Sequence, residues 1–308
     1  MPGSGDSHNQ CLYRQDIMKT EERASSFQCQ GSWLYGILHV PEQAGTKGVL
    51  IVVGGPQYRV GSHRQFTLLA RHLAADGIPV MRFDCRGMGD SEGDPRTFED
   101  MEEDVRCAID TFLKEVPTLN ELVIWGLCDA ASAALFYAHR DQRVTGLVLL
   151  NPWVRTEQGA AKVYLKRYYA ARLFQPELWN KIRRGNFSYG KAIRSLSQIV
   201  GSVLKEKKER IMAAGKADND ESSSTAPLPE RMLAGLRRFN GKILLILSGN
   251  DLTGQEFSDL VKGSAEWQRL LAFPGVLRQD LPEANHTFSR REWKDQVVIW
   301  TSRWVRSW

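Results

Sequence analysis

Long apolar runs and paired cysteine motifs are both missing from this sequence. No apolar run approaches the roughly 18 residues that a membrane-spanning helix needs. The five cysteines show no C-x-x-C spacing, so no zinc-site or redox-motif pattern is present. Their odd number and the lack of a secretory signal favour a reducing, cytoplasmic setting.

Strong charge is missing as well. The net charge of +5 gives no reason to expect a nucleic-acid partner. An apolar content of 42% and a charged content of 25% are ordinary for a soluble globular protein. A chain of 308 residues is long enough for one large α/β domain or two small ones. No pattern implies a metal or an organic cofactor.

Apolar segments of strand length alternate with helical patterns over residues 23–151 and again over residues 240–308. This alternation is typical of a mostly parallel sheet flanked by helices, so we predict an α/β fold. The expected strands cover residues 23–29, 32–40, 48–53, 79–83, 122–125, 144–150, 242–247 and 276–281, and the expected helices cover 63–75, 98–116, 130–138, 266–272 and 290–304.

Two segments fall outside this pattern. Residues 1–22 begin with a polar, Gly/Ser-rich stretch, and we expect a disordered leader there. Met18 stands just before the first strand pattern, so one hypothesis is that translation starts at Met18 and not at Met1. Residues 152–239 interrupt the strands and helices, and we interpret them as a helical cap or lid inserted into the core.

The expected cap is strongly basic. Residues 155–216 contain fifteen Lys and Arg against four Glu, a net charge of +11, and residues 217–229 are acidic and then Ser/Pro-rich. Cationic helices suit an anionic substrate, or the surface of a membrane that the protein contacts peripherally. The alternative is an ordinary solvated helical face.

The stretch from Glu121 to Ser132 carries the strongest functional signal. An apolar strand pattern, a glycine, Cys128 and an Ala-rich helix pattern follow one another, as the nucleophile elbow G-x-Nuc-x-G requires. Gly126 and Ala130 are the small residues that the strained turn and the helix behind it need. The alternative is a buried structural cysteine beside a chance glycine.

Asp251 and His286 each follow a later predicted strand. Catalytic groups of α/β sheets gather at the carboxyl ends of strands, and the chain order of nucleophile, acid and histidine is that of the α/β-hydrolase triad. A histidine takes the proton of the thiol and later protonates the leaving group, while an acid fixes the imidazole. The alternatives are a turn aspartate and a surface-loop histidine.

From about residue 23 to residue 308 the chain resembles the α/β-hydrolase superfamily, in its serine-aminopeptidase-like branch. Four motifs agree in order: Asp84-x-Arg-Gly-x-Gly-x-Ser91, Gly126-x-Cys-x-Ala130, Gly249-x-Asp251 and the His286 loop. The stretch Gly54–Phe66, with the cysteine elbow, more narrowly resembles the type 1 hydrolases associated with the exosortase A system, bacterial proteins encoded near exopolysaccharide genes. The resemblance implies an eight-stranded α/β-hydrolase fold.

Cysteine stands at position 128 where most relatives have serine, and dienelactone hydrolase is the familiar exception. A cysteine nucleophile forms a thioester intermediate, which favours ester and thioester substrates over amides. The N–H of Asp129 is the first expected oxyanion-hole donor, and Gly55 or Gln57 is the second. Asp129 lies one place past the elbow centre, so we reject it as a nucleophile. The glycines of the Asp84 motif predict a rigid turn.

Weaker candidates for contact with substrate are Tyr58, Arg59 and His63, although a histidine at a helix start is more often structural.

We predict a hydrolase that cleaves a small or carrier-bound acyl ester or thioester through an acyl-cysteine. The rivals are an acyltransferase with the same triad, a non-catalytic scaffold and a lipid-surface binder. The oligomeric state does not follow from the sequence.

Overall fold

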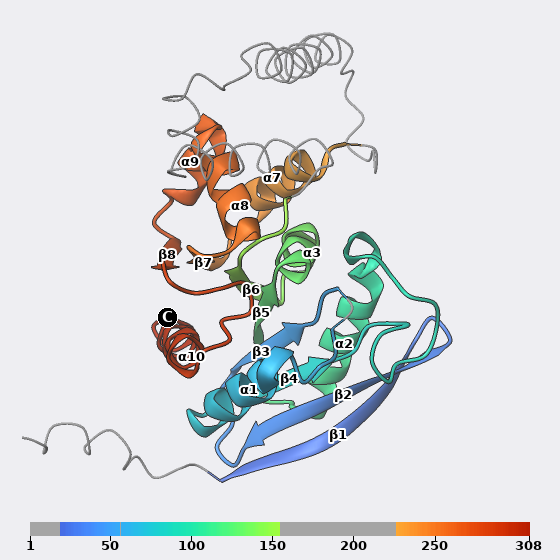
Figure 1. Cartoon of the computed structure of the whole chain (residues 1–308). Coiled ribbons are helices and arrows are strands. Elements are labelled where there is room, and N and C mark those ends of the chain that lie inside the picture. Colours follow the sequence, from blue (N-terminus) through green and yellow to red (C-terminus); the bar gives the residue numbers. More distant parts are fainter. Residues whose placement is uncertain (1–18, 56, 155–225) are drawn as a thin grey trace, which may run out of the picture. The chain divides into compact units, whose positions relative to one another are not determined.

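A sheet of eight strands organises the described part of the chain, which in this computed structural model comprises residues 19–55, 57–154 and 226–308. The strand order is β1-β2-β4-β3-β5-β6-β7-β8 (Figure 1). The strands are β1 (Thr20–Cys29), β2 (Ser32–Pro41), β3 (Lys47–Val52), β4 (Val80–Phe83), β5 (Glu121–Leu127), β6 (Val144–Leu150), β7 (Lys242–Ser248) and β8 (Val276–Leu281).

Antiparallel pairing is confined to one edge, where β2 pairs with both β1 and β4, and the other strand pairs are parallel. The central strands β3, β5, β6 and β7 are almost continuously apolar because helices bury both of their faces. Their carboxyl ends therefore lie at one edge of the sheet, where loops can carry functional side chains.

Helices cover the two faces of the sheet (Figure 1). One apolar cluster joins β3 and β5 to α1 and α10, and the other joins the opposite face to α2, α3 and the helices around β7. The helices are α1 (Gln65–Ala75), α2 (Glu102–Glu115), α3 (Asp129–Tyr137), α7 (Leu228–Arg238), α8 (Leu252–Lys262), α9 (Ala265–Leu271) and α10 (Arg291–Val305). In the described ranges no helix has the length and apolar character that crossing a membrane would require.

The predicted α/β-hydrolase fold is confirmed, with differences at particular elements. β1 begins at Thr20, inside the expected leader, because the early residues pair with the far end of β2. Helix α8 was not predicted. Its first turn contains Thr253 and Gly254, which are poor helix formers, but Asp251 caps it by accepting hydrogen bonds from both of their N–H groups.

The expected cap lies mostly outside the described residues, as does the leader up to residue 18. The chain divides into one unit of residues 1–155 and 228–308 and a second unit of residues 156–227. The last part of the expected cap forms α7, which packs on α3. Gly235 makes this packing possible, because a Cβ there would clash with the carbonyl oxygen of Leu135.

Candidate active site

Cys128 lies at the turn between β5 and α3. Its backbone has φ 63° and ψ −121°, a conformation that costs a non-glycine residue about 1–3 kcal/mol. The turn is sharp enough that a Cβ on Gly126 would stand 2.7 Å from the carbonyl oxygen of Ala130. The sequence therefore supplies small residues on both sides of Cys128, as the strand-turn-helix pattern predicted.

The neighbouring strand holds the backbone of Cys128 in place. Its N–H donates to the carbonyl of Leu150 at 2.8 Å, and its carbonyl accepts from the N–H of Trp153 at 3.1 Å. The side chain is half-buried at the N-terminus of α3. The partial positive charge of a helix N-terminus favours negative charge at this position.

Asp251 lies at the carboxyl end of β7 and begins α8. The residue is 8% exposed, and its side chain accepts hydrogen bonds from the N–H groups of Thr253 at 3.3 Å and Gly254 at 3.0 Å. Burial works to raise its pKa, but the hydrogen bond and positive charge of His286, together with these two N–H groups, bring the pKa below its ordinary value. The carboxylate is therefore held ionised and oriented.

His286 follows β8 and reaches the same edge of the sheet. Its Nδ1 lies 3.0 Å from Oδ2 of Asp251. The hydrogen bond to Asp251, followed by a hydrogen bond with Cys128, raises the pKa of His286 to about 10 against the opposing effect of burial. The structure thus brings together three residues that are spread over more than 150 positions of the sequence, with the imidazole between the carboxylate and the thiol.

The side chain of Asp129 turns back towards the loop after β3. Its Oδ1 accepts the N–H of Ala130 at 2.9 Å, and the carboxylate also accepts hydrogen bonds from the N–H groups of Gly55 and of Asp129 itself. Burial raises the pKa of Asp129, while these N–H groups and the charge of His286 oppose the rise. A carboxylate is therefore bound by several backbone donors beside the nucleophile position.

The two candidates for the second oxyanion donor differ in their surroundings. The N–H of Gly55 points at the same carboxylate as the N–H of Asp129, and the φ of +57° at Gly55 is one that glycine adopts readily. Gln57 is half-buried, and its side-chain Oε1 has no hydrogen-bond partner among the described residues. The arrangement favours Gly55 as the partner of Asp129.

The weaker candidates lie on the loop that leads to α1. Arg59 forms ion pairs with Asp84 and, at 2.7 Å, with Asp90, and the hydroxyl of Tyr58 donates to Asp90 at 3.0 Å. These contacts tie the loop to the turn that follows β4. His63 is exposed, with φ 53°. A role of these side chains in substrate contact stays a prediction.

Asp84 anchors the turn that its motif predicted, and the rigid-turn interpretation is confirmed. Its carboxylate is fully buried and accepts the N–H of Arg59 at 2.7 Å and that of Asp90 at 3.3 Å. Gly87 and Gly89 have φ of 68° and 55°, and a Cβ on Gly89 would clash with the Asp84 carboxylate. The turn is thus a rigid support for the loop of Arg59.

Asn151 was missed by the reasoning from sequence. It is fully buried at the end of β6 and has φ 43°. Its amide donates to Ser248 Oγ at 2.7 Å and to the carbonyl of His286 at 3.5 Å, while its Oδ1 accepts the N–H of Ser248 at 2.9 Å. Asn151 therefore joins the ends of β6 and β7 to the histidine loop. An asparagine between a buried strand and a proline was the available signal.

Comparison with known proteins agrees with the α/β-hydrolase fold. Residues 45–255 match the family model described as serine aminopeptidase, S33, over more than half of the chain. The chain belongs to the S33 family. The solved esterase Pf2001 of Pyrococcus furiosus has the same fold, with a TM-score of 0.59 at 16% identity over 93% of this chain and 94% of that one.

Curated relatives of this S33-family chain match it over shorter stretches. Polyketide transferase claH of Penicillium crustosum is 28% identical over 45% of this chain and 46% of its own length. Thiohydrolase aneE of Aspergillus aculeatus is 34% identical over 26% of each chain. The chain thus spans less than half the length of these relatives.

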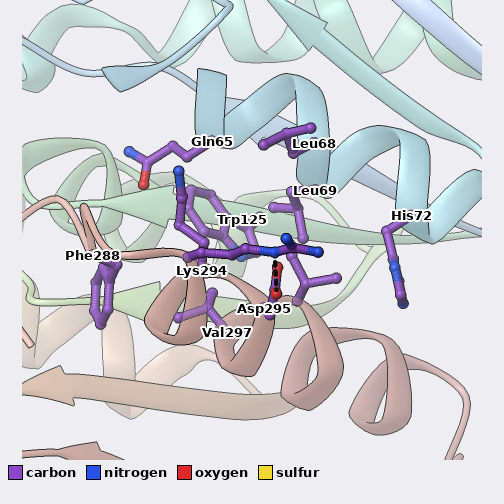
Figure 2. Close-up of a pocket in the computed structure, with 11 residues that line it drawn as sticks. Gln65, Leu68, Leu69, His72, Trp125, Phe288, Lys294, Asp295 and Val297 are labelled. Carbon is purple, nitrogen blue, oxygen red and sulfur yellow. Dashed lines mark ion pairs between the residues drawn. The ribbon is translucent and has the colours of Figure 1, made fainter. Parts of the chain in front are cut away.

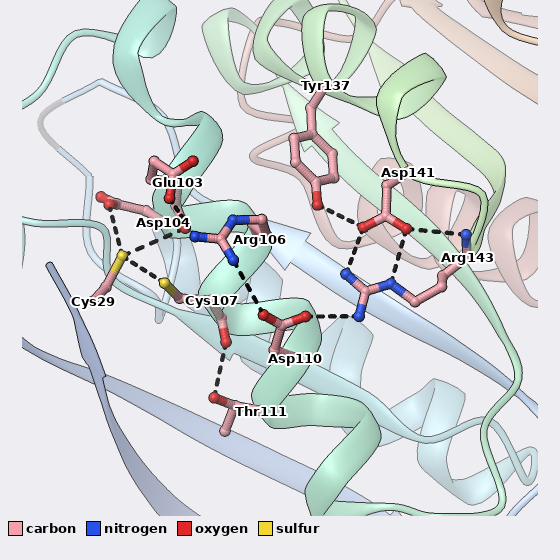
Figure 3. Close-up of polar contacts among 10 residues, drawn as sticks. All are labelled: Cys29, Glu103, Asp104, Arg106, Cys107, Asp110, Thr111, Tyr137, Asp141 and Arg143. Atoms are coloured by element: carbon pink, nitrogen blue, oxygen red, sulfur yellow. Dashed lines mark hydrogen bonds and ion pairs between the residues drawn. The ribbon is translucent and has the colours of Figure 1, made fainter.

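The remaining described cysteines of the S33-family chain have surroundings that differ from those of Cys128. Cys29 on β1 and Cys107 on α2 face one another, with their Sγ atoms 2.7 Å apart, and Cys29 also contacts Asp104 (Figure 3). Burial raises the pKa of Cys29 and of Cys85. Within the described ranges, these thiols have neither a histidine partner nor the strained strand-to-helix backbone of Cys128.

A cavity of about 430 Å³ lies between α1 and α10 of the S33-family fold (Figure 2). Trp125, three residues before Cys128, lines it, as does Phe288, two residues after His286. Cys128, Asp251 and His286 are not among its lining residues. Within the described ranges, no cluster of three or more metal-ligating side chains is present.

Proposed function

We propose that the protein is a cysteine hydrolase of esters or thioesters, acting through an acyl-enzyme. The observation that carries the proposal is the position of the His286 imidazole, 3.0 Å from Asp251 and hydrogen-bonded with Cys128, which lies on a strained strand-to-helix turn. A nucleophile beside a base that a third group orients is the arrangement of covalent acyl transfer.

In the acylation step the sulfur of Cys128 attacks the substrate carbonyl carbon, and the carbonyl electron pair moves to oxygen. The N–H groups of Asp129 and Gly55 are the proposed donors to that oxyanion. The intermediate collapses to a thioester on Cys128 as the bond to the leaving group breaks. His286, whose Nδ1 is engaged by Asp251, uses Nε2 to take the proton of the Cys128 thiol and then to deliver it to the leaving oxygen or sulfur.

In the second step His286 takes a proton from water, which attacks the thioester carbonyl. The carbon–sulfur bond breaks as His286 returns this proton to the sulfur, and the carboxylic acid and the Cys128 thiol are released. A hydroxyl or amine in the place of water gives acyl transfer with the same residues. The names of the relatives, a polyketide transferase and a thiohydrolase, support both outcomes and favour a thioester as the acyl donor.

A finer assignment rests on the stretch Gly54–Phe66. Its resemblance, together with the cysteine elbow, supports membership among the type 1 hydrolases associated with the exosortase A system, and hence a bacterial exopolysaccharide context. A cytoplasmic setting, an anionic acyl substrate and peripheral membrane contact through residues 152–239 belong to the same proposal. The anionic substrate and the membrane contact are inferred from the net charge of residues 155–216 in the sequence, and these residues lie outside the described ranges.

The test is a screen of p-nitrophenyl esters and acyl thioesters in the presence of competing hydroxyl and amine acceptors. Release of free acid alone supports hydrolysis, and an acyl product on the acceptor supports transfer. A scaffold without catalytic activity gives neither product with any donor, and that result would remove the enzyme proposal. Matched assays with Cys128→Ala separate catalysis by the site from spontaneous breakdown of the donor.

A further inference from the structure

The donors that the proposed mechanism needs are already engaged in the free protein. A tetrahedral oxyanion on Cys128 would accept hydrogen bonds from the N–H groups of Asp129 and Gly55. The Asp129 carboxylate accepts hydrogen bonds from both of these groups, and from the N–H of Ala130 at 2.9 Å. A side-chain anion therefore competes for the hydrogen bonds that the reacting oxygen would use.

The loop after β3 is shaped around this carboxylate. Gly54 lies so close to Asp129 that a Cβ on it would overlap Oδ1, and a Cβ on Gly55 would stand 3.4 Å from Oδ2. Two successive glycines thus leave the room that the carboxylate fills. The positive charge of His286 works to lower the pKa of Asp129 as well as that of Asp251. The Asp129 carboxylate is therefore close enough to the imidazole for the two charges to interact.

We propose that Asp129 is an internal occupant of the oxyanion hole, and that a substrate carbonyl binds productively only when this carboxylate has moved out. The proposal rests on the proposed function, because the oxyanion hole has meaning only if Cys128 is the nucleophile. Asp129 then acts as a gating residue: its side chain lowers the reactivity of Cys128 towards acyl donors while leaving the thiol itself accessible.

The displaced carboxylate also bears on specificity. A partly buried carboxylate that loses several N–H donors is costly unless new donors replace them. An acyl donor with a hydroxyl or amide N–H near its carbonyl can supply such a replacement, whereas a plain acyl chain cannot. We therefore expect the gate to favour acyl groups that carry a hydroxyl or amide N–H near the carbonyl over unsubstituted acyl chains.

Two reagents distinguish an effect of Asp129 on the oxyanion hole from an effect on the reactivity of the Cys128 thiol. p-Nitrophenyl acetate acylates a thiol through an oxyanion and releases p-nitrophenolate, whereas iodoacetamide alkylates it by displacement of iodide from a saturated carbon and forms no oxyanion. The quantity to measure is the ratio of the two second-order rate constants at Cys128, by intact mass and peptide mapping. Dividing the acylation rate constant by the alkylation rate constant cancels any change in thiol reactivity that results from removing the negative charge of Asp129.

In Asp129→Ala we expect the acylation-to-alkylation ratio to rise at least about tenfold, since one oxyanion donor is typically worth a factor of 10²–10³. Asp129→Asn is the matched control, because it removes the charge but keeps an oxygen that accepts the same N–H groups. Its ratio should rise less than that of Asp129→Ala.

An unchanged or lower ratio in Asp129→Ala would overturn the gate while leaving Cys128 as the nucleophile. Failure of both reagents to modify Cys128 in the unaltered protein would overturn the proposed function, and the gate with it. A rise in Asp129→Asn equal to that in Asp129→Ala would show that charge alone, and not occupation of the hole, limits acylation.

Discussion

Nδ1 of His286 lies 3.0 Å from Oδ2 of Asp251, and this contact joins the loops that follow the last two strands of the sheet. Because Nδ1 is engaged, Nε2 is the nitrogen left for proton transfer at Cys128. Asp251 is itself fixed by the first turn of α8, so the position of the imidazole depends on a helix cap. Orientation of the base and capping of a helix are thus two tasks of one carboxylate.

Asp251→Asn separates these two tasks. Asparagine is as good an N-cap as aspartate, so we expect α8 to be retained, while the stability that the charged pair with His286 contributes is lost. It cannot stabilise the imidazolium or select its tautomer, so acyl-donor turnover should fall by about a hundredfold to ten thousandfold. Asp251→Ala, the comparison variant, also removes the cap and should be about 1 kcal/mol less stable than Asp251→Asn. Turnover by Asp251→Asn close to that of the unaltered protein would refute the orienting role.

The raised pKa of His286 predicts a pH dependence of stability. A histidine whose pKa rises from 6.5 to about 10 on folding stabilises the folded state fully below pH 6.5. This contribution declines as pH rises and is lost as pH passes about 10. Denaturant unfolding of the protein and of His286→Gln at several pH values measures it. Their difference in free energy of unfolding should shrink from pH 6 to pH 10, and a constant difference would contradict the shift.

Cysteine labelling tests the surroundings of each thiol. Iodoacetamide should modify Cys128 before the other three described cysteines, because its half-buried thiol lies beside the His286 imidazole, which can take its proton. The half-exposed Cys107 should follow, whereas Cys29 and Cys85 are buried, have raised pKa values and should react only after unfolding. Timed labelling with peptide mapping gives the order. Faster modification of Cys107 than of Cys128 would count against the nucleophile assignment.

The turn of Asp84 can be tested through its glycines. In Gly89→Ala the new Cβ meets the buried Asp84 carboxylate, in addition to the strain of φ 55°, so we expect a loss of about 2–4 kcal/mol of stability. Gly31→Ala is the control: its φ is 83°, but nothing lies within 4 Å of the new Cβ, and about 1 kcal/mol should be lost. Equal losses in the two variants would mean that the contact with Asp84 is unimportant.

Much of the fold was predictable because its buried strands are short apolar runs bounded by turn residues. The segments that became β6 and β8 were predicted with the observed bounds. The position of Cys128 was predictable too, since a strand, a glycine and a small-residue helix leave few other conformations for the turn. Asp251 and His286 followed from their chain order, each after a predicted strand.

The supporting contacts were not predictable, because they join residues distant in the sequence. Nothing in the neighbourhood of Asn151 shows that its amide will reach Ser248 and the carbonyl of His286. The carboxylate of Asp129 was considered only as a rejected nucleophile, and its hydrogen bond from Gly55 depends on how the loop after β3 folds over the elbow. Helix α8 was missed because its propensity is weak and its cap is a residue expected to serve catalysis.

The central claim is that Cys128 carries the acyl group, and the most direct measurement is the intact mass of the protein quenched during turnover of an acyl donor. The account predicts an added acyl mass that maps to Cys128. Cys128→Ala should show no adduct and a turnover lower by more than about a thousandfold, while Cys128→Ser keeps only weak activity. An adduct on another residue, or turnover by Cys128→Ala at the rate of the unaltered protein, would contradict it.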